Sequence, residues 1–187
     1  MRLTVITPTI GRRSLLDTLL SVAVQLEPDD EHIVIGDSVQ PEAEAMCKSF
    51  GAIYRDGPVS HNYGNTQRDV AAAIAAGEYL MYCDDDDVLT PDALALVREA
   101  VKAQPGIPHL FRMRHPTFGV LWQRPALVCG NVGTPMFVVP NDGRRSLWDD
   151  GNSQTYEGDY RFIARTVANH GGRCGWQEGI VCNVGGI

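Results

Sequence analysis

The chain has 187 residues, of which 44% are hydrophobic and 21% are charged, and this balance fits one globular domain with a buried core. The formal net charge is −7 and the sequence contains no run of Lys or Arg, so it gives no indication of nucleic-acid binding or of electrostatic docking on an anionic membrane. The five cysteines form no CxxC pair, which disfavours a disulfide framework or a zinc site and favours reduced thiols in a cytoplasmic protein. Residues 1–7 resemble a first strand and not a signal peptide, and no stretch is long and apolar enough to cross a bilayer.

The first 115 residues alternate between β-branched apolar runs and segments with helical apolar spacing. The expected strands cover residues 3–7, 32–35, 52–55, 79–83 and 109–113. The expected helices cover residues 14–26, 41–50, 66–76 and 91–104. We expect Pro8 to end the first strand, Gly77 to be the C′ residue of the third helix, and Thr90 and Pro91 to begin the fourth. This alternation predicts an α/β fold with a mostly parallel, doubly wound sheet.

Residues 116–187 have a different pattern, which predicts a smaller and more mixed subregion of the same domain. Residues 118–140 are strand-like but interrupted by Gly and Pro, and residues 141–152 form a polar, Gly-rich segment that we expect to be a mobile loop. Residues 156–170 have helical spacing and are followed by Gly171 and Gly172, and residues 176–184 are the last expected strand. We therefore expect one domain, with residues 1–115 and 116–187 as its two halves.

Four consecutive aspartates, residues 84–87, follow the apolar run 79–83 and precede the fourth expected helix. This order places the carboxylates at the carboxyl end of a strand, the edge at which open α/β sheets bind ligands. Adjacent carboxylates repel one another, and hard oxygen ligands suit Mg²⁺, Mn²⁺ or Ca²⁺ better than zinc. From the aspartates alone, a metal site and a solvated acidic loop are equally good interpretations.

Four segments carry a more specific signal, and the third is the most specific because the spacing from Arg68 to Asp84 and the Gly-Glu-Tyr sequence both fit one pattern. The segments are Val5-Ile6-Thr7-Pro8-Thr9, Ile33-Val34-Ile35-Gly36-Asp37-Ser38, the run from Gly64-Asn65-Thr66-Gln67-Arg68-Asp69 through Ala75-Ala76-Gly77-Glu78-Tyr79-Leu80 to Asp84, and Glu157-Gly158-Asp159-Tyr160. Together they resemble the GT-A glycosyltransferases, in particular family 2, whose members carry a DxD motif. The chain departs from the family pattern at Gln67 and Asp69, and Gly158 separates the two acids of the last segment.

The resemblance implies metal-dependent transfer of a hexosyl group from a nucleoside-diphosphate sugar, with a UDP-sugar favoured, to an acceptor hydroxyl with inversion. It implies Mn²⁺ or Mg²⁺ as cofactor, residues 1–115 as the nucleotide-sugar-binding half and residues 116–187 as the acceptor-side half. The implied nucleotide-sugar-binding residues are Thr7, Pro8, Thr9, Asp37, Arg68, Asp84 and Asp85. Asp86 is the implied metal ligand and His170 a further candidate. Asp159 is the expected general base, and Glu157 is the other candidate.

Each of these assignments has a structural alternative. The alternative for Asp37 is a cap of a helix or turn, and the alternative for Arg68 is a surface ion pair. Asp159 and His170 would each interact favourably with the helix dipole, at the N-terminal and C-terminal end respectively. Asp85 and Asp87 form an alternative register of the DxD motif. Three tryptophans either stack on a sugar acceptor or pack in the core: Trp122, Trp148 and Trp176.

Two other functions remain open. A sugar nucleotidyltransferase would need a Gly-rich basic loop after the first strand, of which residues 8–13 supply only part. The second is a degenerate, non-catalytic module that binds a nucleotide sugar. It remains open because Gly158 separates the two acids that the family pattern places together. The sequence does not identify the acceptor, and nucleic acid is not indicated.

Overall fold

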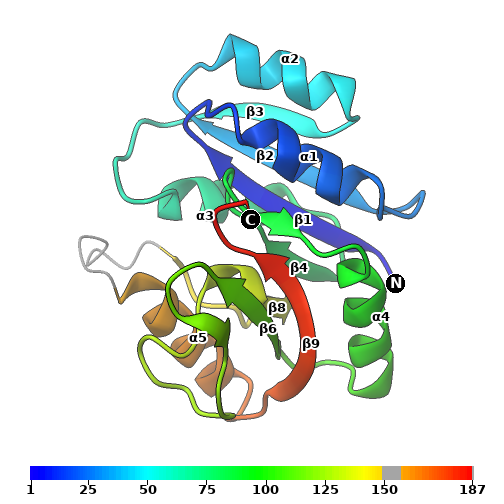
Figure 1. Cartoon of the computed structure of the whole chain (residues 1–187), viewed down its shortest axis with the longest axis vertical. Coiled ribbons are helices and arrows are strands. Elements are labelled where there is room, and N and C mark those ends of the chain that lie inside the picture. The colour runs from blue at the N-terminus through cyan, green and yellow to red at the C-terminus, as the bar shows by residue number, and fades with distance from the viewer. Residues whose placement is uncertain (149–156, 187) are drawn as a thin grey trace.

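The structure is a computed structural model that describes residues 1–148 and 157–186 (Figure 1). The elements run in the order β1 (Leu3–Thr9), α1 (Leu15–Ala23), β2 (Glu31–Asp37), α2 (Pro41–Ser49), β3 (Ile53–Gly57), α3 (Asn65–Ile74), β4 (Tyr79–Tyr82), β5 (Val88–Leu89), α4 (Ala93–Ala103), β6 (His109–His115), β7 (Gly119–Leu121), the 3₁₀ turn η1 (Thr134–Met136), β8 (Phe137–Pro140), α5 (Gly158–Asn169) and β9 (Gly175–Asn183). None of the helices among these residues combines the length and the hydropathy needed to span a bilayer.

One sheet contains all the strands, in the order β3-β2-β1-β4-β8-β6-β9-β5, with β7 paired to β6. Strands β3, β2, β1 and β4 are parallel, as expected for the first half. Strand β8 runs antiparallel to β4 and β6, β6 is parallel to β9, and β5 is antiparallel to β9. The expected α/β fold, with a mostly parallel half and a mixed half, is therefore confirmed.

The core lies on both sides of this sheet. All seven residues of β1 are buried, which is typical of a central parallel strand covered on both faces. Trp148 stacks on Phe162 of α5 with ring centroids 3.8 Å apart, and Tyr82 of β4 meets both rings edge-on. Trp122 is also buried and donates its indole N–H to the Leu110 carbonyl at 3.3 Å. Trp122 and Trp148 therefore pack in the core, as the second interpretation of the tryptophans predicted.

The expectation that Pro8 ends the first strand is wrong, because β1 continues to Thr9. The Ile6 carbonyl accepts a hydrogen bond from the backbone amide of Cys83, just past β4. The backbone hydrogen-bonding groups of Ile6 therefore point towards β4, and those of Pro8, two residues later, point to the same side. Strand β4 has already ended at Tyr82, so the missing N–H of Pro8 costs no ladder hydrogen bond.

Two expected helix signals are also wrong. Helix α3 ends at Ile74, so Gly77 does not cap it. Gly77 packs closely against β1, where glycine is needed because a Cβ would lie 2.5 Å from the Thr4 hydroxyl oxygen. Helix α4 begins at Ala93, and Thr90 uses its hydroxyl to donate to the Ile180 carbonyl of β9 at 2.7 Å. The short strand β5 thus separates the aspartates from α4.

The second half is less regular than its sequence indicates. The strand-like stretch 118–140 contains only β7, η1 and β8, and residues 122–133 lie outside regular helices and strands. Gly171 and Gly172 follow α5 with φ angles of 69° and 74°, as expected for glycines that end a helix. Residues 149–152 of the expected loop, and residue 156 of the expected helix, lie outside the described residues.

Candidate functional site

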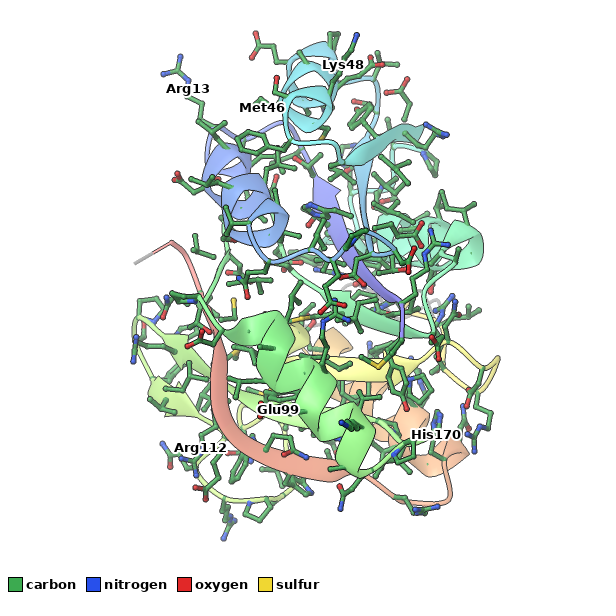
Figure 2. All side chains as sticks on the ribbon, turned by 90° about the vertical axis from the view of Figure 1, so that its right-hand side faces the viewer. Arg13, Met46, Lys48, Glu99, Arg112 and His170 are labelled. Atoms are coloured by element: carbon green, nitrogen blue, oxygen red, sulfur yellow. The ribbon has the colours of Figure 1, made fainter. Side chains whose placement is uncertain are left out.

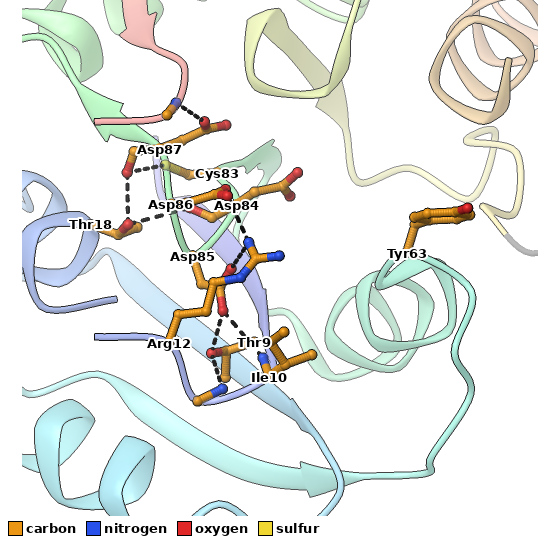
Figure 3. Close-up of polar contacts among 12 residues, drawn as sticks. Thr9, Ile10, Arg12, Thr18, Tyr63, Cys83, Asp84, Asp85, Asp86 and Asp87 are labelled. Atoms are coloured by element: carbon orange, nitrogen blue, oxygen red, sulfur yellow. Dashed lines mark hydrogen bonds and ion pairs between the residues drawn. The ribbon is translucent and has the colours of Figure 1, made fainter. Parts of the chain in front are cut away.

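The acidic loop, residues 84–87, lies between β4 and β5 and is held from two sides (Figure 3). The Thr18 hydroxyl of α1 contacts the carbonyl oxygens of Asp87 at 2.7 Å and Asp84 at 3.3 Å. The Gly185 amide, just past β9, donates to Asp87 Oδ1 at 3.0 Å. The first helix and the last strand therefore fix the loop together.

The four carboxylates alternate between buried and partly exposed. Asp85 and Asp87 are buried, whereas the side chains of Asp84 and Asp86 are 31% and 45% exposed. Asp85 Oδ2 accepts hydrogen bonds from the Thr9 hydroxyl at 2.7 Å and from the backbone amide of Ile10 at 3.2 Å. Burial raises the pKa of Asp85, and burial together with the Asp84 charge raises the pKa of Asp87 to about 8. This alternation makes Asp84 and Asp86 the more exposed pair of the loop.

Arg12 is the counter-ion of the outer part of the loop. Its Nη1 lies 2.7 Å from Asp86 Oδ2 and 3.0 Å from Asp85 Oδ1 (Figure 3). Arg12 comes from the turn between β1 and α1. Because β1 and β4 are parallel neighbours, this turn lies beside the loop that follows β4. One guanidinium therefore offsets part of the repulsion between two adjacent carboxylates.

Arg68 performs the same role from inside the protein. Its Nη2 contacts Asp84 Oδ1 at 2.5 Å, and its Nη1 donates to the Tyr63 carbonyl at 2.9 Å and to Asn65 Oδ1 at 3.1 Å. Burial acts to lower the Arg68 pKa, but the charges of Asp84 and then Asp159 outweigh it and raise that pKa. Arg68 is buried, so the surface ion-pair alternative does not apply.

A cavity of about 490 Å³ opens beside the acidic loop at the carboxyl ends of β1, β2 and β4. Its lining includes the following predicted residues: Pro8, Thr9, Asp37, Arg68, Asp84, Asp85 and Asp86. Asp37 Oδ1 accepts hydrogen bonds from the Ser60 amide at 2.8 Å and from Gln67 Nε2 at 2.9 Å, which fix its orientation. Because the resemblance described above implies that these residues bind the nucleotide-sugar donor, we call this space the donor cavity.

A second cavity of about 350 Å³ borders the same loop and reaches β6, β7 and α5. It shares Tyr63, Arg68, Asp84 and Asp86 with the donor cavity. Asp159 lines it, and Asp159 Oδ2 accepts a hydrogen bond from the Thr134 amide at 3.0 Å. We call this space the second cavity.

Three predicted site residues lie outside both cavities. Thr7 is buried, with its hydroxyl oxygen 2.9 Å from His32 Nε2. Glu157 is the exposed cap residue that precedes α5. His170 lies at the opposite end of α5 from Asp159, with Nδ1 2.8 Å from the Thr166 carbonyl oxygen (Figure 2).

Sequence reasoning did not assign a site role to six residues that line the donor cavity: Ile10, Arg12, His61, Tyr63, Gly64 and Gln67. Arg12 could have been found, because it follows the first strand at the sheet edge where the aspartates lie. Tyr63 is 77% exposed and has a left-handed φ of 60°, and neither property has a sequence signal. Gly64 is required by packing, since a Cβ there would lie 2.7 Å from Pro8 Cβ.

The residues present fit a hard divalent cation. Among the described residues, no three His, Cys, Asp or Glu side chains gather as a complete metal site. Asp84 and Asp86 nevertheless offer carboxylate oxygens to both cavities. Mg²⁺ and similar ions are commonly held by one or two carboxylates together with substrate phosphates, and this donor set suits that arrangement.

Comparison with known proteins gives a family and a fold. The sequence model described as Glycosyl transferase family 2 matches residues 4–172, whereas no curated protein matches the chain. Among solved structures, S. aureus TarS 1-349 in complex with UDP has a TM-score of 0.81 at 17% identity over 98% of this chain and 60% of that one. The mannosyltransferase PcManGT from Pyrobaculum calidifontis, in complex with GDP-Man and Mn²⁺, has a TM-score of 0.69 at 14% identity over 98% of this chain and 56% of that one. The chain thus spans less than two thirds of the length of these structures, and at such identities the likeness concerns the fold.

Proposed function

We propose, from the premise that the chain belongs to glycosyl transferase family 2, that it transfers a sugar from a nucleoside-diphosphate sugar to an acceptor hydroxyl. One observation carries this proposal. Asp84 and Asp86 stand between two cavities, one of which contains Asp37 and the other Asp159. A leaving group on one side and an attacking hydroxyl on the other would meet at this pair of aspartates.

The donor cavity suits the nucleoside. Both hydrogen bonds to Asp37 go to Oδ1, so Oδ2 is left to accept a bond from a base N–H or a ribose hydroxyl. Arg68 holds Asp84 in place beside this cavity. We favour a UDP-sugar as donor, in keeping with the UDP bound to S. aureus TarS, and the GDP-Man bound to PcManGT makes a guanosine donor the second choice.

A divalent cation, Mn²⁺ or Mg²⁺, would be held by Asp86 and the donor diphosphate. When bound, it supplies a positive charge that stabilises the negative charge developing on the diphosphate leaving group. Asp86 suits this role better than its neighbours, because its side chain is more exposed than those of Asp84 and Asp85, and Asp87 is buried. The buried Asp85 and Asp87 then support the loop.

Asp159 is our candidate for the general base. The bond from the Thr134 amide fixes Oδ2 and leaves Oδ1 to take the proton of an acceptor hydroxyl. Attack from the side of Asp159, opposite the leaving diphosphate, would invert the configuration at the sugar carbon. Glu157 is exposed and borders neither cavity, which argues against it as the base.

A thermal-shift series with UDP and GDP, with and without Mn²⁺, tests the donor site, because a ligand that binds only the native state raises the melting temperature. Asp86→Ala should abolish the Mn²⁺-dependent part of the shift. Asp29→Ala removes an exposed carboxylate between α1 and β2 and should leave the shift unchanged. Equal shifts in both variants would remove Asp86 from the site.

Product analysis separates the three possible functions. Transfer or hydrolysis of the donor sugar supports a glycosyltransferase. Release of pyrophosphate from a nucleoside triphosphate would identify a nucleotidyltransferase instead. Donor binding without any turnover, across a panel of acceptors, would identify a binding module.

A further inference from the structure

The second cavity is lined by two kinds of side chain. Four are acidic: Asp84, Asp86, Asp87 and Asp159. The apolar ones come from β6, β7, η1 and the segments beside them, and from the start of α5, and we call them the apolar wall: Met113, Phe118, Leu121, Val132, Pro135 and Tyr160. A ligand that fills this cavity must therefore carry both polar and apolar groups.

An aromatic pair stands at the mouth of the apolar wall. His115 and Phe118 stack with ring centroids 4.7 Å apart, and Phe118 remains 55% exposed. His115 Nδ1 accepts the amide hydrogens of Thr117 at 3.1 Å and of Phe118 at 3.3 Å, which fixes the orientation of the ring. The mouth thus presents an aromatic surface.

A third cavity of about 620 Å³ adjoins the second cavity at Phe118. The two cavities share Phe118, Leu121, Cys129 and Gly130, and the other residues that line the third are Gln123, Arg124, Val128 and Asn131. An apolar chain that leaves the second cavity at Phe118 would therefore meet Leu121 and the 43% exposed Val128, beside polar side chains.

The charges of the second cavity disfavour an anionic ligand. Arg68 is the only Lys or Arg that lines it among the described residues, and its guanidinium already binds Asp84, Asn65 and the Tyr63 carbonyl. Residues 149–156 contain no Lys, Arg or His, so they offer no further cation. A phosphate or carboxylate near the reacting hydroxyl would face the carboxylates of Asp84, Asp86 and Asp159.

We propose that the acceptor is a neutral glycoside with an apolar alkyl or aryl aglycone. Its sugar hydroxyl lies beside Asp159 and its aglycone lies along the wall that ends at Phe118. This inference rests on the proposed function and adds the class of acceptor to it.

The test compares octyl β-D-glucoside, below its critical micelle concentration, with methyl β-D-glucoside and glucose 6-phosphate. Binding is measured by saturation-transfer NMR and titration calorimetry in the presence of UDP and Mn²⁺. The octyl glucoside should bind most tightly. Phe118→Ala should weaken its binding about five- to tenfold through loss of apolar contact, and should leave the methyl glucoside unaffected.

Val120→Ala is the matched control. Val120 lies on β7, two residues from Phe118, is 37% exposed and lines neither the second nor the third cavity. It should bind octyl glucoside as the unsubstituted protein does. Equal affinity for the octyl and methyl glucosides, equal loss in both variants, or preferred binding of glucose 6-phosphate would each overturn the inference.

The thermal shift with UDP and Mn²⁺ distinguishes this inference from the proposed function. If UDP stabilises the protein but no preference for the octyl group appears, the acceptor class is wrong and the proposed function stands. If the octyl preference depends on Phe118 while no nucleotide binds, the apolar site is supported and the proposed function fails.

Discussion

Arg12 should compete with the divalent cation for Asp86. Its guanidinium nitrogen lies 2.7 Å from Asp86 Oδ2, on the carboxylate that we propose as the metal ligand (Figure 3). A cation that takes this carboxylate must displace Arg12 and break the ion pair. Arg12→Ala should therefore tighten the binding of Mn²⁺ measured in the absence of nucleotide.

The magnitude follows from the exposure of the pair. The side chains of Arg12 and Asp86 are 46% and 45% exposed, so their attraction is screened by water. Exposed ion pairs of this kind are worth about 0.2–1 kcal/mol. Removal of the competing pair should therefore lower the Kd for Mn²⁺ by about 1.5- to 5-fold.

The assay is a titration with Mn²⁺ in which electron paramagnetic resonance counts the free ion. Arg13→Ala is the control, because it removes the same charge at the next residue. The side chain of Arg13 projects from the edge of the molecule (Figure 2). If Arg12→Ala binds Mn²⁺ no more tightly than Arg13→Ala, Arg12 is not a competitor for the metal.

The remaining predictions concern the base, the packing of β1 and the pH dependence of stability. Asp159→Asn should cut turnover by about 10²-fold or more and leave donor affinity unchanged, while Glu157→Gln should cost less; the reverse order in a steady-state assay would exchange their roles. Gly77→Ala should lower the free energy of unfolding by about 1–3 kcal/mol in urea titrations, because its Cβ would lie 2.5–2.8 Å from atoms of β1. An unchanged urea midpoint would mean that β1 shifts to accommodate the added methyl group without loss of stability. The raised pKa of about 8 for Asp87 means that the folded state keeps a proton that the unfolded state loses above about pH 4, so stability falls as pH rises towards 8. Asp87→Asn should flatten this fall in metal-free thermal unfolding between pH 5 and pH 8, and a slope equal to that of the unsubstituted protein would show that Asp87 ionises normally.

The parallel half of the fold and the donor cavity could be predicted because their signals are local. Asp37 and Asp84 each follow an apolar run, and the carboxyl ends of adjacent parallel strands meet at one edge of the sheet. The run that includes Arg68 could be recognised from its spacing alone. The structure places all three side chains on the same cavity.

The other features depend on contacts between distant residues. Whether Pro8 ends β1 depends on where β4 stops, and the need for glycine at position 77 comes from the backbone of β1. The two residues of β5 form a strand only because β9 lies beside them. The second cavity combines β6, β7 and α5 with the irregular segment 122–133, whose interrupted pattern resembles a continuous strand in sequence.

The acidic loop is braced by residues that follow it at a long distance in the sequence, and this order has a consequence for biosynthesis. The amide of Gly185 donates to Asp87 across 98 residues, and β5 pairs with β9. A ribosome therefore synthesises the loop well before either contact can form. The nascent protein carries an acidic loop without this support, and the cation site proposed above would be complete only after β9 has joined the sheet.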